Sequence, residues 1–214
     1  MTARPIEPRS LDGLALEAEI DFPPTLGGSV LVCHPHPQMG GTMNAPLLLA
    51  LRDALVPRGW AVLRFNYRGI GRSEGTSGTG GSEEADARGA LERLRLTCPN
   101  VPLAVVGWSF GAGVAVRILD DEPGIEACVA IAPSVGGKEG VTIPLPRPGE
   151  LRAHTPILVV CGDGDDVISL DDARAWSDAV PTASYVELPG ANHLFWGQYE
   201  KLGGTVASFL DGFL

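Results

Sequence analysis

Short apolar segments alternate with amphipathic helical patterns along nearly the whole chain, and this alternation restricts the possible folds most strongly. Seven segments have the length and apolar character of strands; they span residues 14–20, 29–33, 60–66, 102–106, 125–132, 157–161 and 185–188. Most are apolar throughout, as in strands buried on both faces, whereas 14–20 alternates like a half-exposed strand. Helical patterns follow most of them, over residues 45–58, 83–96, 110–119, 171–179 and 199–210. The alternation predicts an α/β fold with a mostly parallel central sheet and helices on both faces.

The strand and helix segments form one uninterrupted series, which bears on domain organisation. The chain has 214 residues, a length that suits one domain with a continuous core. No internal repeat or linker divides it, so we predict a single domain over residues 1–214. Residues 133–156 are irregular and rich in proline and glycine, and they are too few to form a lid domain.

Local signals predict where the first helices begin and end. Asn44 stands before an alanine and Pro46, so we expect Asn44 to be the N-cap of the first helix. Gly59 is expected to end that helix. Ser82 is expected to be the N-cap of the second helix.

The charge balance excludes some classes of partner. The chain has 16 Lys and Arg against 26 Asp and Glu, a formal net charge of −10. It has no basic stripe to neutralise phosphates, which argues against a nucleic-acid partner. The same charge disfavours strongly anionic substrates and membrane surfaces. No apolar run has the length of a signal peptide or a membrane span, so we expect a cytoplasmic protein.

The sequence gives little support to a metal or a nucleotide cofactor. The four cysteines have no metal-type spacing and are interpreted as small buried apolar side chains; they are Cys33, Cys98, Cys128 and Cys161. Residues 69–74 begin like a dinucleotide-binding loop, but the third glycine is missing and no helix opens directly from it. A phosphate-binding G-x-x-x-x-G-K-[ST] motif does not occur. We therefore expect no cofactor and no metal.

A G-x-S-x-G pattern lies between the apolar segment 102–106 and the helical pattern that follows it. In a nucleophile elbow the serine occupies a sharp turn between a strand and a helix, with its hydroxyl exposed above the sheet. The chain can pass through such a turn only with small neighbours, here Gly107 and Gly111. The pattern makes Ser109 the candidate nucleophile.

A serine nucleophile needs a base, and the base needs an orienting carboxylate. In an elbow architecture these residues follow the serine in the order acid, histidine. His193 follows the last predicted strand and is the candidate base, whereas His154 precedes a strand and is expected at the opposite edge of the sheet. Asp163, Asp165 and Asp166 follow the preceding strand, and their positions leave all three open as the acid.

The oxyanion that forms on a carbonyl substrate needs two N–H donors. One is expected from Phe110, directly after the nucleophile, and the other from the loop 34–44. Pro35 and Pro37 carry no N–H, so the backbone of His36 is the first candidate, with Met39 and Gly40 as alternatives. The side chains of His34 and His36 are expected to be structural or to line the pocket.

The motif-bearing segments together resemble the α/β-hydrolase superfamily, and within it the small lidless bacterial "HPHP" members related to dienelactone hydrolases. The matching segments are residues 34–44, 64–75, 107–111, 162–167 and 190–195. The resemblance implies that the acid is Asp165, the third residue after the glycine that ends the strand. It also implies hydrolysis of carboxylic esters. One departure is Ser169, where the family often has proline, and we do not expect it to disturb the triad.

The sequence thus predicts a serine hydrolase that cleaves short or soluble acyl esters through an acyl-enzyme on Ser109, His193 and Asp165. Alternatives are a thioesterase, a peptidase or a dienelactone-type hydrolase on the same triad, or a non-catalytic binding or scaffold protein of the same fold. The expected partner is a small-molecule ester. Apolar residues near the site could line an acyl pocket or belong to the core; they are Met39, Trp108, Phe110, Leu194, Phe195 and Trp196.

Overall fold

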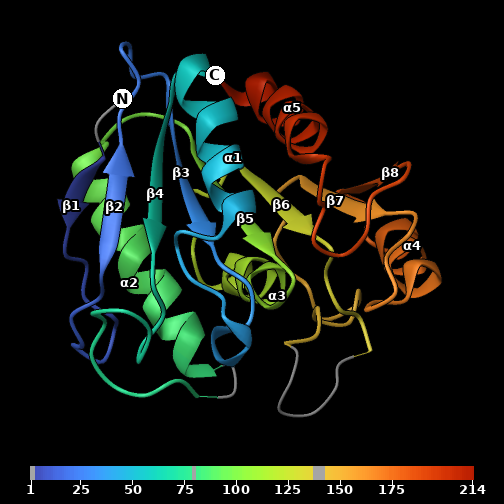
Figure 1. Cartoon of the computed structure of the whole chain (residues 1–214), viewed down its shortest axis with the longest axis horizontal. Helices are drawn as coiled ribbons and strands as arrows, with labels where there is room; N and C mark the ends of the chain where they lie inside the picture. Colours follow the sequence, from blue (N-terminus) through green and yellow to red (C-terminus); the bar gives the residue numbers. More distant parts are fainter. Residues whose placement is uncertain (1–2, 79–80, 137–142) are drawn as a thin grey trace.

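The computed structural model describes residues 3–78, 81–136 and 143–214. Within these ranges eight strands form one sheet in the order β1-β2-β4-β3-β5-β6-β7-β8 (Figure 1). The strands are β1 (Arg4–Ile6), β2 (Ala18–Asp21), β3 (Gly28–Cys33), β4 (Trp60–Phe65), β5 (Leu103–Trp108), β6 (Ala127–Ile131), β7 (Ile157–Gly162) and β8 (Ala183–Leu188). Strands β3 to β8 are parallel, and β1 and β2 add an antiparallel margin. The predicted mostly parallel sheet is therefore confirmed.

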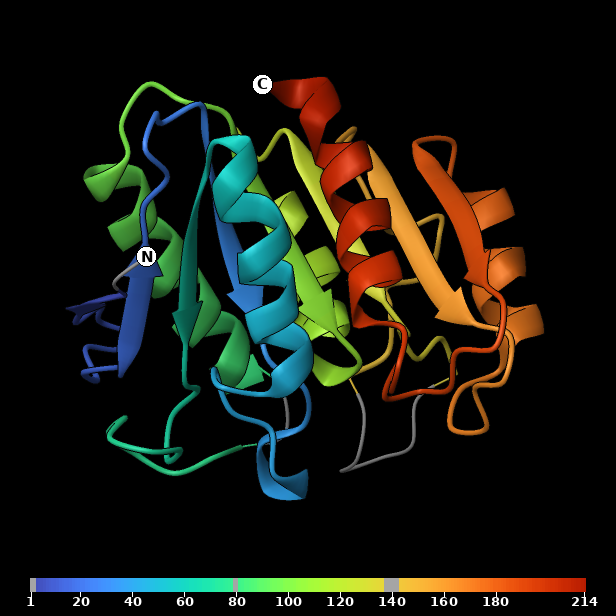
Figure 2. The same cartoon turned by 45° about the horizontal axis from the view of Figure 1, so that its top comes forward.

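Helices cover both faces of the sheet, as Figure 2 shows. Their bounds are α1 (Pro46–Leu55), α2 (Gly81–Thr97), α3 (Phe110–Arg117), α4 (Leu170–Ala179) and α5 (Tyr199–Leu210). Side chains of α1 and α5 belong to one buried apolar cluster, and those of α2, α3 and α4 belong to the other. The sheet therefore separates two core layers.

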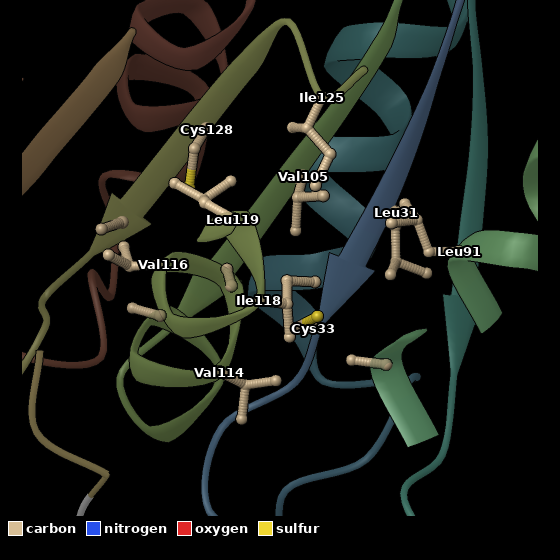
Figure 3. Packing of buried hydrophobic residues seen from close by; sticks show 14 of the residues in the cluster. Leu31, Cys33, Leu91, Val105, Val114, Val116, Ile118, Leu119, Ile125 and Cys128 are labelled. Carbon is tan, nitrogen blue, oxygen red and sulfur yellow. The ribbon is translucent and has the colours of Figure 1, made fainter. Parts of the chain in front are cut away.

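The period of two along a strand explains why the central strands are apolar throughout. In β3, Leu31 and Cys33 point into the layer beneath α2 and α3, where Figure 3 shows them beside Val105. Val30 and Val32 of the same strand point into the layer beneath α1 and α5. A strand with helices on both faces must be apolar at every position, because successive side chains alternate between the faces.

Three local predictions need correction. The N-cap of α1 is Ala45, and Asn44 instead accepts a hydrogen bond from Arg64 through its side-chain oxygen at 3.0 Å. Ser82 lies inside α2, which already includes Gly81. The strand predicted over residues 14–20 begins in the structure only at Ala18, four residues later than predicted, because the chain before it forms a turn and an isolated bridge. Gly59 ends the first helical segment in the left-handed conformation, as expected.

The carboxyl ends of the parallel strands meet at one edge of the sheet, and four motif-bearing loops leave from it. These loops follow β3, β5, β7 and β8 and carry the predicted site residues. The predicted irregular segment 133–156 also follows a strand; within it residues 137–142 lie outside the described residues, and the remainder contains no helix or strand. No helix in the described ranges is long and apolar enough to span a membrane.

Candidate active site

Ser109 occupies the turn between β5 and α3 with unusual backbone angles, φ 54° and ψ −113°. A positive φ is uncommon for a residue with a side chain and costs on the order of 1–3 kcal/mol. The surrounding structure must therefore hold it in place. The Ser109 N–H donates to the carbonyl of Ile131 at 2.8 Å, which ties the turn to the neighbouring strand β6. This is the geometry expected of a nucleophile elbow.

The two glycines of the elbow are required by close backbone contacts. A Cβ on Gly107 would lie 2.0 Å from the carbonyl oxygen of Gly111. A Cβ on Gly111 would lie 2.3 Å from the carbonyl oxygen of Cys33 and 2.6 Å from that of His34. Backbone atoms cannot give way as a flexible side chain can. Gly111 therefore allows the start of α3 to approach the end of β3, where the loop 34–44 begins.

His193 bridges the serine and an aspartate. Its Nε2 lies 3.1 Å from Ser109 Oγ, and its Nδ1 lies 2.8 Å from Asp165 Oδ2. The Asp165 side chain is fully buried and that of His193 is 12% exposed. A carboxylate can only accept, so Nδ1 carries the hydrogen and Nε2 is left to accept from the serine hydroxyl. The three residues thus form one hydrogen-bonded chain with the order that proton removal from Ser109 requires.

Only one of the three candidate aspartates contacts His193. The second carboxylate oxygen of Asp165 accepts from the N–H groups of Val167 and Ile168, at 2.9 and 3.2 Å, which fixes the carboxylate. Asp163 instead accepts from the N–H of Gly190 at 2.7 Å and joins the acid loop to the histidine loop. Asp166 is exposed beside the site. The contact with His193 therefore distinguishes Asp165 from its neighbours.

Two hollows meet at Ser109 and His193. The larger, of about 450 Å³, lies over the start of α1 and reaches Tyr199. The smaller, of about 310 Å³, lies beside Asp166 and Val167. Asp166 was a candidate for the acid only, and Tyr199 and Val167 were not predicted at the site, since nothing in their local sequence pattern marks them. The sequence signal for these two residues is only their position: Val167 lies in the loop that carries Asp165, and Tyr199 follows the loop that carries His193.

The predicted pocket-lining residues divide into two groups. Met39, Trp108, Leu194 and Trp196 line the larger hollow. Phe195 does not line either hollow: it is fully buried in the apolar core, with a positive φ of 54°, so of the two roles left open for it the structure shows core packing.

Phe110 and Trp108 also have structural contacts. The Phe110 ring is buried, contacts Tyr67 and His36 edge to face and lines neither hollow, so it too belongs to the core, the second of the two roles left open for it. The Trp108 indole N–H donates to the carbonyl of His193 at 3.2 Å. Trp108 thereby holds the backbone of the histidine loop while its ring faces the hollow.

The backbone N–H groups near Ser109 can be compared as oxyanion donors. Phe110 is the first residue of α3, where an N–H has no partner within the helix. The N–H of Met39 already donates to the carbonyl of His36 at 3.1 Å, which removes it as a free donor. Within the described ranges no acceptor is found for the N–H of His36, and this residue lines both hollows together with Ser109. Phe110 and His36 are thus available for a substrate oxygen, and so is the alternative Gly40, which lines the larger hollow and for whose N–H no acceptor is found in the described part of the chain.

The far end of the loop 34–44 is fixed by residues of β4 and its extension. The side-chain oxygen of Asn66 accepts from the N–H of Met43 at 2.8 Å. The guanidinium of Arg64, which is fully buried, donates to the carbonyl of Met43 at 3.0 Å and pairs with Asp21 and Glu19 at 3.2 and 2.9 Å. Buried charges require such pairing. The motif over residues 64–75 therefore supports the loop that carries His36.

The four cysteines are free and buried, as predicted. Burial raises the pKa of the Cys33 and Cys161 thiols to about 12, and it raises those of Cys98 and Cys128 as well. A thiol with a raised pKa is a poor nucleophile. In the described ranges, no three His, Cys, Asp or Glu side chains are grouped so that they could hold a metal ion.

Comparison with known proteins gives a consistent result. Residues 28–151 match the family model described as "Serine aminopeptidase, S33". An uncharacterised protein of Rickettsia prowazekii (strain Madrid E) is 31% identical over 191 residues, which cover 84% of this chain and 77% of that protein.

Solved structures similar to this chain cover nearly its whole length. An α/β serine hydrolase without a lid from Xanthomonas campestris is 25% identical with a TM-score of 0.85, covering 100% of this chain and 96% of that one. An α/β serine hydrolase homologue from Coxiella burnetii is 28% identical with a TM-score of 0.86, covering 98% of both chains.

Proposed function

Because this chain belongs to the α/β serine hydrolase family described by the serine aminopeptidase S33 model, we propose that it hydrolyses carboxylic esters through an acyl-enzyme on Ser109. The observation that supports the proposal most is the hydrogen-bonded chain from Ser109 Oγ through His193 to Asp165. A scaffold protein of the same fold would not require a serine with a positive φ, a histidine in contact with its hydroxyl and a buried aspartate behind that histidine.

In the first half of the proposed reaction, His193 Nε2 takes the proton of Ser109 as Oγ attacks the ester carbonyl. The negative oxygen of the tetrahedral intermediate accepts from the N–H groups of Phe110 and His36. Asp165 stabilises the protonated His193. When the intermediate collapses, the C–O bond to the alcohol breaks, His193 gives its proton to the leaving oxygen, and the acyl group stays on Ser109.

In the second half, water replaces the alcohol. His193 removes a proton from the water as the water oxygen attacks the acyl carbonyl, and the same two N–H groups bind the oxyanion. Collapse breaks the bond to Ser109 Oγ, which regains a proton from His193. The carboxylic acid leaves, and the enzyme returns to its starting state without any external reagent other than water.

The residues that line the two hollows favour an uncharged substrate. None of the residues that line them is Lys or Arg, and Asp166 places a carboxylate beside the smaller one. A dienelactone-type substrate carries a carboxylate and would lack a Lys or Arg partner among the residues that line the two hollows. The larger hollow is apolar and open to solvent, since Met39 and Trp196 at its rim are 74% and 68% exposed. We therefore infer short or soluble neutral acyl esters as the substrate class.

A p-nitrophenyl ester series of rising acyl length, from acetate to palmitate, tests this proposal. We expect hydrolysis of the short and medium esters, a fall in kcat/KM for the longest ones, and no activity in Ser109→Ala. The corresponding thioester and an aminoacyl p-nitroanilide are run in parallel to separate the thioesterase and peptidase alternatives. Preferred cleavage of the anilide, or a strong preference for palmitate, would overturn the assignment.

A further inference from the structure

His34 is the first residue after β3, and both nitrogens of its fully buried ring are engaged. Nε2 lies 3.1 Å from the backbone nitrogen of Tyr67, and Nδ1 lies 2.7 Å from the carbonyl oxygen of Pro35. A backbone N–H can only donate, so Nε2 must accept. The ring hydrogen is then on Nδ1 and is donated to Pro35, which accepts it.

The surroundings of His34 favour this single neutral form. Burial lowers the pKa of the ring to about 4, against an ordinary value of 6.5. A protonated ring would carry a hydrogen on Nε2. Two N–H groups would then face each other, and the Tyr67 N–H would lose its acceptor. The neutral Nδ1–H tautomer satisfies both contacts at once.

The bond to Pro35 acts on a peptide group that belongs to the active site. The carbonyl of Pro35 and the N–H of His36 are parts of the same peptide plane, and no cis peptide occurs in the described residues. In a planar trans peptide these two groups point in opposite directions. A hydrogen bond that holds the carbonyl toward His34 therefore turns the His36 N–H away from it. The free His36 N–H belongs to the residue that lines both hollows beside Ser109.

The loop also packs closely against the carbonyl side of this peptide. A Cβ on Gly41 would lie 2.1 Å from the carbonyl oxygen of Pro35 and 2.7 Å from that of His36, so the loop closes directly against them. The Gly41 N–H donates at 3.0 Å to the carbonyl of His36, which belongs to the next peptide along the chain. The peptide therefore cannot rotate freely, and the ring of His34 supplies the only side-chain hydrogen bond to its carbonyl within the described ranges.

We propose that His34 is a positioning residue of the oxyanion hole: its Nδ1–H orients and polarises the Pro35–His36 peptide, so that the His36 N–H is presented to the substrate oxyanion. A hydrogen bond to a peptide carbonyl strengthens the donor at the other end of that peptide. The inference rests on the proposed ester hydrolysis at Ser109, and it assigns a function to a histidine that does not touch the substrate.

Two substitutions separate the donor function of His34 from its acceptor function. The side-chain amide of His34→Asn can reach the position of Nδ1 and donate to Pro35, whereas that of His34→Gln reaches toward Nε2 and can accept from Tyr67. Loss of one oxyanion donor lowers kcat by about 10²–10³-fold, so we expect His34→Gln to lose about 10–100-fold in kcat with KM nearly unchanged. His34→Asn should retain most of kcat. The exposed His154→Gln is the control.

A thionoester substrate gives a readout that a merely structural role would not change. Sulfur accepts hydrogen bonds more weakly than oxygen, so an intact oxyanion hole favours the ordinary ester over its C=S analogue. We expect this preference to shrink in His34→Gln and to persist in His34→Asn and His154→Gln. Equal losses of kcat in both His34 variants with an unchanged preference, or a fully active His34→Gln, would overturn the proposal.

The tautomer itself can be measured in the unmodified protein, which keeps the test independent of how the variants fold. A long-range ¹H–¹⁵N correlation spectrum should show the His34 ring protonated at Nδ1. Protonation at Nε2 would overturn the inference. A wild-type protein that hydrolyses neither the ester nor the thionoester would instead refute the proposed ester hydrolysis. Failure of the inference about His34 and failure of the proposed function therefore give different results.

Discussion

At the scale of single residues, the acid loop shows how neighbouring side chains of one type acquire different roles. Asp165 is buried and bonded to His193, whereas Asp163 bonds to a backbone N–H and Asp166 is exposed. The difference is set by where the backbone turns after β7. The side chains themselves are chemically equivalent.

The first prediction follows from this division. Asp165→Asn should lower kcat by about 10⁴-fold, because an amide at this position favours the wrong tautomer of His193. Asp163→Asn is the matched control and should retain kcat within about tenfold, since the amide oxygen can still accept from the Gly190 N–H and Asp163 does not contact His193. Steady-state kinetics on p-nitrophenyl acetate measure both. Equal losses in the two variants would show that the carboxylate of Asp165 has no special part in the reaction.

The second prediction concerns the pH dependence of stability. The pKa of His34 is lowered by burial to about 4, and Glu83 and His36 are the titratable groups that act on it. Between pH 6.5 and 4 the unfolded chain binds a proton at His34 that the folded chain does not. The stabilisation is complete above pH 6.5 and falls by at most about 3 kcal/mol as the pH drops to 4.

Urea unfolding at several pH values checks this prediction. The wild type should lose free energy of unfolding between pH 6.5 and 4 more steeply than His34→Gln, because glutamine does not titrate. The difference between the two slopes isolates His34 from other titrating groups. Parallel curves for the two proteins would mean that the ring is protonated in the folded state.

At the scale of elements, the close approach of α3 to the end of β3 brings the two proposed oxyanion donors together. Gly111→Ala should destabilise the protein by about 1–3 kcal/mol or more and lower kcat, since its Cβ would press on the Cys33 carbonyl at 2.3 Å. Gly204→Ala in α5 has open space around the new Cβ and should stabilise by about 0.5–1 kcal/mol. Urea unfolding and kcat measure both, and a harmless Gly111→Ala would contradict the packing argument.

Much of the element pattern can be predicted from the sequence, for a physical reason. Strands β3 to β7 are apolar runs because both of their faces are covered, and this signal is strong. Strand β1 is missed because it is a short, largely exposed edge strand that contains Pro5. The position of β2 next to β4, antiparallel to it, depends on tertiary pairing that no local pattern encodes.

The candidate site is partly predictable for a similar reason. The loops that carry Ser109, Asp165 and His193 must share an edge, because β5, β7 and β8 are parallel in one sheet. The choice of Asp165 needed the resemblance to a family, since three aspartates lie within four residues. The direction of Phe195 depends on its positive φ, which sequence propensity does not anticipate for an aromatic residue.

At the scale of the whole molecule, the net charge of −10 and the absence of Lys and Arg from the lining of both hollows disfavour an anionic substrate. A neutral ester should therefore be cleaved about tenfold faster, in kcat/KM, than an analogue with a carboxylate on its acyl chain at low salt. The ratio should shrink as the Debye length falls from about 10 Å at 0.1 M to about 3 Å at 1 M. A preference for the anionic ester would favour the dienelactone-type alternative.

The central claim is that Ser109 is an activated nucleophile, and covalent labelling tests it most directly. The protein is treated with a fluorophosphonate and examined by intact mass and peptide mapping. We predict one adduct per chain on Ser109, slow labelling in His193→Ala and none in Ser109→Ala. An unlabelled wild type, or a Ser109→Ala variant that labels equally well, would contradict the account.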